Sequence, residues 1–397
     1  MTVQFYSINW VRAYEVWATR PKVTVTKKKS ITLKDVAKEA GVSIGIASRV
    51  LGGYGSFSEK SRASVVAAAE KVNYQANGVA RALRLKRTNT IGVLISQINS
   101  YHWTTFVQGV EESAKLAGYC VILSNTGDDP AREMEYLQDM RERGVDGIIA
   151  SPLDCNLRAF RQAADSGFAM VTVNVQMGGE KASVVMTDEK RAGADAVEYL
   201  SSLGHRRIGL VAGAVELKSG RQRLDSYRVG LEEAGIGFDD DLVVYGNYNQ
   251  DEAYAGARKL ISLPEPPTAL LVCNESMTGA ALRCLRDHGV SIPGDISLVG
   301  FDDPDWAGFY APPITTLREE RYYMGKLACD ALLLGLEQTH PPQEPTLVTL
   351  RTRLVVRQSC APPRHRQTLI LQLTTSTLEE TWIPHSVVDR KRANSDS

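Results

Sequence analysis

Three polar residues each stand directly after an apolar run that has the length of a buried strand. These residues are Asn174, Asn274 and Asp302. If the strands are parallel, their carboxyl ends meet at one edge of a sheet, where amide and carboxylate groups can hydrogen-bond a small ligand. Spacing alone leaves strand-capping turns as an equal alternative for these side chains.

No arrangement in the sequence is typical of a catalytic or cofactor site. Residues 41–45 (Gly-Val-Ser-Ile-Gly) fit the pattern of a hydrolase nucleophile, but the residues before them have the spacing of an amphipathic helix and not of a buried strand. No complete dinucleotide-binding glycine motif, P-loop or H-E-x-x-H motif occurs. The acidic run at residues 302–305 lacks the glycine and the distant glutamate of a calcium loop. We therefore expect no catalytic residues, no metal and no cofactor, and a protein that is not an enzyme.

The elements that would position the polar residues alternate between strand-like and helix-length segments. This alternation predicts an α/β fold of parallel, doubly wound sheets covered on both faces. The number of units predicts two lobes with a cleft at the carboxyl ends of the strands. The expected strands cover residues 91–96, 119–125, 147–150, 170–174, 183–188, 207–213, 242–245, 269–274 and 296–302.

The N-terminal part carries three shorter helical patterns. Thr32 and Asp35 form a capping box, and Gly41 ends the first helix. Ser43 can cap a second helix after a three-residue turn, and Ser58 can cap a third that runs to about residue 73. This is helix-turn-helix spacing. The third helix is expected to bury Val65, Val66, Ala69 and Val72.

The net charge of zero hides a strong asymmetry along the chain. Residues 1–87 carry 16 basic and 5 acidic side chains, a net charge of +11, and the rest of the chain carries −11. A basic segment with a folded motif is typical of nucleic-acid binding, whereas charge alone is equally consistent with a solvated tail.

The rest of the composition is that of an ordinary globular protein. The chain has 43% apolar residues and no run of roughly 18 apolar residues, which predicts a soluble protein that is not exported. Its six cysteines are far apart and most lie in apolar runs, so buried, reduced thiols are expected. They are Cys120, Cys155, Cys273, Cys284, Cys329 and Cys360.

Several short motifs occur in an order that resembles one known family. They are residues 31–37 (Ile-Thr-Leu-Lys-Asp-Val-Ala), 41–43 (Gly-Val-Ser), 48–51 (Ser-Arg-Val-Leu), 73–74 (Asn-Tyr) and 79–83 (Val-Ala-Arg-Ala-Leu). Over roughly residues 30–360 the chain resembles the lactose-repressor (LacI/GalR) family of bacterial transcription regulators. The resemblance implies a three-helix DNA-binding domain, a hinge helix that folds in the minor groove, and a two-lobed periplasmic-binding-protein-like core.

The resemblance also implies a function and a set of site residues. An effector in the cleft would change the angle between the lobes and so control operator affinity. The DNA-binding residues would be Ser43, Ile44, Gly45, Ser48, Arg49, Asn77, Leu83 and Arg84. The effector-binding residues would be His102, Trp103, Asn174, Arg221, Tyr248, Asn274 and Asp302, although ordinary packing also explains Trp103 and Tyr248.

The chain departs from the family pattern at several of these places. The hinge lacks the usual proline near Asn77, and apolar Ile44 and Gly45 stand at the start of the second helix, where they offer contact with a thymine methyl group and close backbone approach. In the cleft, Gln97 stands where relatives that bind neutral sugars often have an aspartate, and Asn174-Val175 stands where they often have an Asp-Arg pair. Fewer carboxylates would favour an acidic or phosphorylated ligand.

The expected organisation and partners complete the sequence interpretation. Residues 1–29 are a disordered or mis-assigned extension, 30–76 a DNA-binding domain, 77–88 a hinge, 89–360 the effector-binding and dimerisation domain, and 361–397 a disordered tail. The partners are double-stranded operator DNA and a sugar, sugar acid or sugar phosphate, with no membrane. The protein is expected to be a cytoplasmic homodimer or a tetramer. A transport-associated solute-binding protein and an α/β enzyme are the alternatives.

Overall fold

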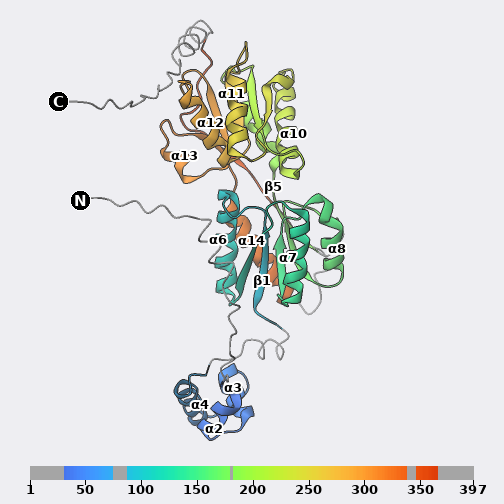
Figure 1. Ribbon diagram of the computed structural model, residues 1–397, viewed down its shortest axis with the longest axis vertical. Coiled ribbons are helices and arrows are strands. Elements are labelled where there is room, and N and C mark those ends of the chain that lie inside the picture. Colours follow the sequence, from blue (N-terminus) through green and yellow to red (C-terminus); the bar gives the residue numbers. More distant parts are fainter. Residues whose placement is uncertain (1–30, 75–86, 179–181, 338–345, 365–397) are drawn as a thin grey trace, which may run out of the picture. The chain divides into compact units, whose positions relative to one another are not determined.

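The computed structural model describes residues 31–74, 87–178, 182–337 and 346–364, which belong to two compact units divided between Thr88 and Asn89 (Figure 1). The predicted DNA-binding residues Asn77, Leu83 and Arg84 lie outside the described residues. So do the predicted extension at residues 1–29 and the tail from residue 365.

The first unit contains the helices α2 (Leu33–Ala40), α3 (Ile44–Gly52) and α4 (Glu59–Lys71). Their predicted starts are confirmed, because the Asp35 carboxylate accepts bonds from the backbone nitrogen and hydroxyl of Thr32 at 2.8 and 2.7 Å. The side chains of Ser43 and Ser58 likewise accept backbone N–H groups of the helices that they precede. The buried residues of this unit are Val36, Ala37, Ala47, Val65 and Ala68.

One prediction for this unit is wrong. Val66 is 41% exposed, although it was expected in the core with Val65. Consecutive residues of a helix point about 100° apart, so Val65 and Val66 cannot share one narrow buried face.

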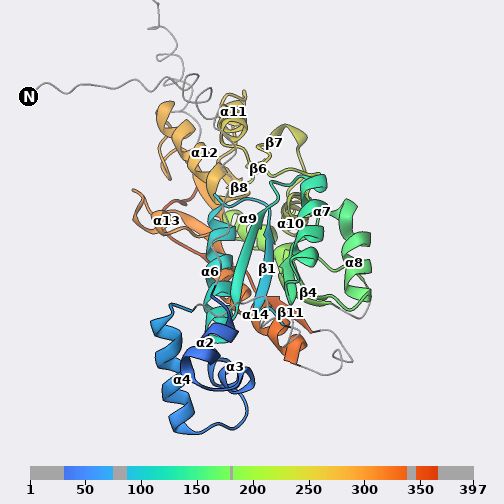
Figure 2. The same cartoon turned by 60° about the horizontal axis from the view of Figure 1, so that its bottom comes forward.

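The second unit begins with a six-stranded parallel sheet that forms one lobe. Its strand order is β2-β1-β3-β4-β5-β11. Helices α6 (Tyr101–Leu116) and α14 (Arg321–Glu337) cover one face of this sheet, and α7 (Pro130–Glu142) and α8 (Leu157–Asp165) cover the other (Figures 1 and 2). The strands are β1 (Thr90–Ile95), β2 (Cys120–Asn125), β3 (Gly147–Ala150), β4 (Ala169–Val173), β5 (Ser183–Thr187) and β11 (Leu347–Leu350).

The second lobe repeats the same strand order, β7-β6-β8-β9-β10-β12. Its strands are β6 (Ile208–Ala212), β7 (Val243–Tyr245), β8 (Ala269–Val272), β9 (Ser297–Phe301), β10 (Thr315–Arg318) and β12 (Arg353–Val355). Its helices are α9 (Glu189–Ser202), α10 (Lys218–Glu233), α11 (Gln250–Ile261), α12 (Glu275–Asp287) and α13 (Asp305–Phe309). Helix α9 packs against α10, and α11 packs against α12.

The chain passes between the lobes three times, after β5, after β10 and between β11 and β12. The nine predicted strands are present, each within two residues of the expected bounds. The expectation of purely parallel sheets is wrong at one strand, because β12 runs antiparallel to β10. A strand that returns from the other lobe by a short connection is free to enter the sheet in either direction.

The prediction of buried thiols holds for Cys273, Cys284 and Cys329 but is wrong for Cys120 and Cys155, which are exposed. Cys120 is the first residue of β2, which lies at the edge of its sheet. An edge strand has a neighbour on one side only, so an apolar sequence environment does not guarantee burial there.

Two glycines allow α6 and α14 to pack backbone against backbone. A Cβ atom on Gly109 would collide with the carbonyl oxygen of Tyr322, and a Cβ on Gly325 would collide with that of Phe106. This close approach fixes α14 to the first lobe after the chain has left the second. Within the described residues, no helix is both long and apolar enough to cross a bilayer.

Candidate functional sites

A cavity of about 150 Å³ lies where the carboxyl ends of the strands of both lobes converge. Residues after β1, β2, β3 and β4 line it from the first lobe, and residues after β6, β7, β8 and β9 line it from the second. In each sheet the order of the strands reverses at the first of these strands, which is where ligands bind in open α/β sheets. Six of the seven predicted effector residues contribute to the lining: His102, Trp103, Asn174, Tyr248, Asn274 and Asp302.

Arg221 is the predicted effector residue that does not line this cavity. Its guanidinium instead pairs with the carboxylate of Asp154, a lining residue of the first lobe, and donates to the carbonyls of Val215 and Glu216 at 2.9 and 2.7 Å. Since Arg221 belongs to α10 of the second lobe, this ion pair joins the two lobes at the rim. The neighbouring Arg223 does line the cavity.

The two lining asparagines also stabilise the local backbone. The side-chain oxygen of Asn174 accepts the backbone N–H of Thr187 at 2.8 Å, and that of Asn274 caps α12 by accepting the N–H of Met277 at 2.8 Å. Both asparagines therefore cap local backbone, which is the alternative role that the sequence left open for them. Because each oxygen already serves the fold, the amide nitrogen is the group that each asparagine offers a ligand.

Aromatic rings form part of the wall. The rings of His102 and Trp103 lie with centroids 4.7 Å apart, and Trp103 makes an edge contact with Phe106. The Tyr248 hydroxyl lies 3.0 Å from the Ser219 hydroxyl, and burial raises the pKa of Tyr248 to about 12. Tyr248 therefore stays protonated and neutral at physiological pH.

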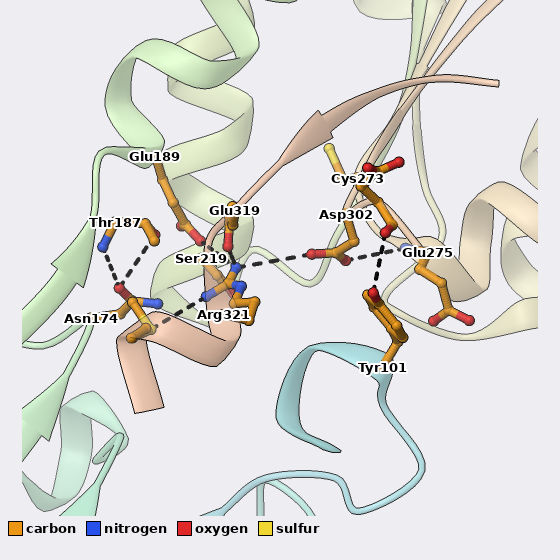
Figure 3. A network of polar contacts seen from close by, with 12 residues as sticks. Tyr101, Asn174, Thr187, Glu189, Ser219, Cys273, Glu275, Asp302, Glu319 and Arg321 are labelled. Carbon is orange, nitrogen blue, oxygen red and sulfur yellow. Dashed lines mark hydrogen bonds and ion pairs between the residues drawn. The ribbon is translucent and has the colours of Figure 1, made fainter. Parts of the chain in front are cut away.

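A buried network of charges, part of which lines the cavity, joins the connections between the lobes (Figure 3). Arg223 lies 3.2 Å from Glu189 and 3.5 Å from Glu319, and Arg321 contacts Glu319 directly. Arg321 also lies 3.8 Å from Glu189 and 4.0 Å from Asp302. Three carboxylates thus share two guanidinium groups, and each side chain is at most 6% exposed.

The pKa shifts in this network follow from burial and from neighbouring charges. Burial opposes a charge on Arg223, yet the carboxylates led by Glu189 raise its pKa. Burial lowers the pKa of Arg321 to about 10, which still leaves it protonated at neutral pH. For His102, burial and then the positive charges of Arg321 and Arg223 lower the pKa well below its usual value. His102 is therefore a neutral imidazole.

The sequence interpretation missed Glu189, Glu319 and Arg321 as partners of the cleft. All three flank the crossing points, directly after β5 and β10. These residues could have been found as charged residues at the ends of apolar strands where the chain changes lobe. A charge at such a junction is buried and must be paired inside the protein. Asp128 and Asp154, which also line the cavity, follow strands as the predicted residues do.

In the first unit, the predicted groove residues lie together on α3 and its N-cap. Ile44 is 49% exposed. The hydroxyls of Ser48 and Tyr54 lie 2.8 Å apart, and Arg49 Nε donates to the Gly45 carbonyl at 3.3 Å. The side chains of Ser48 and Arg49 are therefore held by local contacts before any DNA is bound.

Comparison with known proteins identifies both units. Residues 32–77 match the model of bacterial regulatory proteins of the lacI family, and residues 197–360 match a periplasmic binding protein-like domain. The chain is 31% identical over 304 residues to the HTH-type transcriptional repressor PurR of Vibrio atlanticus, which covers 76% of this chain and 91% of that protein. This chain belongs to the lacI family.

Further relatives and solved structures agree with this membership. PurR of Photobacterium profundum is 30% identical over 330 residues, covering 83% of this chain and 98% of that one. The structure of the Lac repressor dimer bound to operator and the anti-inducer ONPF superposes with a TM-score of 0.76 at 27% identity, covering 84% and 100% of the two chains. The regulator CelR in complex with cellobiose gives 0.60 at 30% identity, covering 83% and 99%.

The membership confirms the family and the fold class expected from the sequence. The protein is a helix-turn-helix transcriptional regulator controlled by a small-molecule effector, and it is not an enzyme. The alternatives of a solute-binding protein and an α/β enzyme are not favoured.

Proposed function

We propose that the protein represses transcription by binding a near-palindromic operator as a homodimer, and that a small molecule of the sugar class in the cavity sets its operator affinity. The observation that carries this proposal is that the cavity is bounded by both lobes and bridged by bonds between them. These are the Arg221–Asp154 ion pair, the bond from Lys218 to the Asn174 carbonyl at 3.0 Å, and the bond from Tyr101 to the Asp303 carbonyl at 3.2 Å. A ligand that occupies this space must change or strengthen those bonds, which couples occupancy to the arrangement of the lobes.

The proposal includes the domain organisation that we expected from the sequence. We propose a DNA-binding domain over residues 30–76, a hinge over 77–88 and an effector-binding and dimerisation domain over 89–360, acting in the bacterial cytoplasm. The two matched family models, over residues 32–77 and 197–360, support this division. A dimer is proposed because a two-fold operator requires two copies of α3, and the Lac repressor that resembles this chain binds its operator as a dimer.

We propose the same site residues as before, with the roles that their surroundings support. Asn174 and Asn274 would donate to ligand oxygens, Asp302 would accept from a ligand donor, and Trp103 and Tyr248 would stack on a ring. Arg221 would reach the ligand only after leaving Asp154. A sugar is favoured because solved relatives include complexes with cellobiose and ribose.

The lining charges do not favour the sugar acid or sugar phosphate considered from the sequence. The lining lacks the carboxylates that relatives often have at the positions of Gln97 and Asn174. It nevertheless contains five other carboxylates and only two basic side chains, those of Lys218 and Arg223. An anionic ligand would have to overcome that excess.

The test is retention of genomic DNA fragments by the full-length protein at physiological salt, followed by sequencing. Recovery of one short near-palindrome is expected. Arg49→Ala should abolish this selective retention, whereas Arg62→Ala, an exposed residue of α4 paired with Glu59, should leave the recovered sequence unchanged. Retention that is indifferent to sequence in the unmodified protein would refute an operator-binding function.

A further inference from the structure

The cavity between the lobes carries an excess of negative charge. Its ionisable lining residues other than His102 and Tyr248 are Asp128, Asp154, Glu189, Glu216, Asp302, Lys218 and Arg223. Both cations are already engaged, since Lys218 donates to the Asn174 carbonyl at 3.0 Å and Arg223 binds Glu189 and the Cys273 carbonyl. Asp154 is paired with Arg221, and Glu216 is exposed to solvent. The two carboxylates with the least compensation are Asp128, which has no ion pair among the described residues, and Asp302, whose nearest cation is the shared guanidinium of Arg321 at 4.0 Å.

Asp302 is the more deeply buried of the two, with 5% of its surface exposed. Its Oδ2 accepts the backbone N–H of Glu275 at 3.3 Å, but Oδ1 has no hydrogen-bond partner among the described residues. The guanidinium of Arg321 is 4.0 Å from Oδ1 and is shared with Glu189 and Glu319. A buried carboxylate oxygen without a donor is costly, so a donor from a ligand would be stabilising here.

Asp128 is half-buried and has one weak partner, the side-chain nitrogen of Gln97 at 3.4 Å. Burial raises the pKa of Asp128, which is the expected effect when no cation compensates the carboxylate. Asp128 therefore adds negative potential to the cavity without a positive charge of its own to balance it.

The aromatic part of the wall is also suited to a cation. His102, Trp103 and Tyr248 are among the residues that line the same cavity. The faces of tryptophan and tyrosine rings attract positive charge, and His102 is neutral, so it does not repel one. Aromatic faces are typical of sites for organic ammonium groups, and the carboxylates of Asp128 and Asp302 add negative charge beside them.

We infer that the ligand of this cavity is a polyhydroxylated ring of single-sugar size that carries a protonated amine, with Asp302 Oδ1 accepting from the ammonium group. The cavity of about 150 Å³ is comparable in volume with one that holds a single small ring molecule. The ring hydroxyls would use the amide nitrogens of Asn174 and Asn274. This inference rests on the proposed function, since it names the effector of the same site.

A divalent metal ion is the other kind of cation to consider as the ligand of these residues. Donor atoms of His102, Asp302 and Glu319 lie within 4.8 Å of one another. However, Arg321 and Arg223 already occupy the space beside Glu319, and a metal ion would lie next to both guanidinium groups. Arg321 also lies near an ammonium group at Asp302, but a divalent ion carries twice the charge and would lie beside both guanidinium groups, so the repulsion is larger for the metal ion.

The experiment is calorimetric titration of the full-length protein with matched sets of ligands. Glucosamine, galactosamine and mannosamine are each compared with the parent hydroxyl sugar and with the N-acetyl derivative, and ZnCl2, MgCl2 and glucose 6-phosphate are titrated separately. At least one amine should bind about tenfold or more tightly than both of its neutral counterparts, which is the advantage of a charge-assisted hydrogen bond. Equal binding of a neutral counterpart, binding of the phosphate, saturable binding of either metal alone, or no binding by any of the amines would overturn the inference.

The variants Asp302→Asn and Asp128→Asn remove one charge each with little change of shape. Asp302→Asn should weaken the amine about tenfold or more and the neutral counterparts less than about threefold, while Glu135→Gln, an exposed carboxylate on α7, should change neither. If Asp302→Asn fails to fold, Asp128→Asn keeps the test, because it should reduce the same preference. Operator retention is measured on the same preparations: its absence refutes the proposed function, whereas intact retention with equal binding of neutral sugars refutes only the amine.

Discussion

The guanidinium of Arg357 binds both carboxylate oxygens of Asp303, at 2.7 and 3.1 Å. Arg357 follows β12 and Asp303 follows β9, so this pair ties the returning end of the chain to the second lobe. The adjacent carboxylate, Asp302, has a different environment because its neighbours are shared charges at the cavity. Although burial alone would raise the pKa of Asp303, Arg357 and Thr316 hold it below its usual value.

We predict that Arg357→Ala lowers the free energy of unfolding by about 3 kcal/mol, because it leaves a carboxylate that is 3% exposed without its bidentate partner. Arg318→Ala is the matched control. Arg318 reaches the same carboxylate at 2.9 Å but is 52% exposed, so its loss should cost less than about 1 kcal/mol. Urea unfolding followed by circular dichroism measures both values, and similar losses in the two variants would contradict the assignment.

The second prediction concerns the backbone contact between α6 and α14. Gly109→Ala or Gly325→Ala should destabilise the protein by about 1–3 kcal/mol, since each new methyl group meets a main-chain carbonyl of the other helix. Gly335→Ala lies in the same helix α14 with no atom within 4 Å of the added carbon, and it should be neutral or stabilising by about 0.5 kcal/mol. Thermal unfolding distinguishes the two cases, and equal melting temperatures for all three variants would show that the helices separate easily.

Local signals in the sequence predicted the elements well because they act over a few residues. Thr32, Ser43 and Ser58 begin helices, and the apolar runs form the strands, since capping bonds and strand burial need no distant partner to be recognised. The resemblance supplied the residues of the cleft in the same way, position by position.

Pairings between distant segments were not predictable from these patterns. Arg221 was expected at the ligand and is bonded to Asp154, 67 residues away in sequence, because the partner of a long side chain depends on how the lobes approach. The same holds for Glu319 and Arg321, whose burial follows from their position where the chain passes between lobes. Cys120 is exposed because β2 lies at the edge of its sheet. The order of strands along the sequence does not show which strand is at the edge.

The third prediction concerns pH. The pKa of His102 is lowered well below its usual value in the folded protein, so the unfolded chain binds a proton that the folded one does not once the pH falls below about 6.5. The free energy of unfolding should therefore decrease as the pH falls from about 6.5 to 5, by up to about 1.4 kcal/mol per pH unit for this residue.

His102→Gln should reduce this slope by about one proton. A residual slope is expected from His205, which is also buried and whose pKa burial also lowers. Urea unfolding at a series of pH values gives the slopes, and parallel curves for the two proteins would mean that His102 is charged in the folded state.

The last prediction concerns the ion pair between Arg221 and Asp154 at the rim of the cavity. Asp154→Arg places two cations on opposite lobes, and Arg221→Asp places two anions there; each should favour separation of the lobes. The double exchange restores an attractive pair with the opposite orientation. Because the two side chains are 42% and 48% exposed, the pair contributes at most about 1 kcal/mol, so each single variant should change operator affinity by less than about fivefold.

Operator titrations of the four proteins without ligand, at low and at high salt, form a double-mutant cycle. The single variants should deviate in the same direction and the double variant should return towards the original affinity, with all differences shrinking at high salt because exposed charges are screened. If the effects of the two single exchanges simply add in the double variant, the ion pair does not link the lobes to operator affinity. The coupling between cavity and DNA would then depend on the buried network of Glu189, Arg223, Glu319 and Arg321, which salt does not reach.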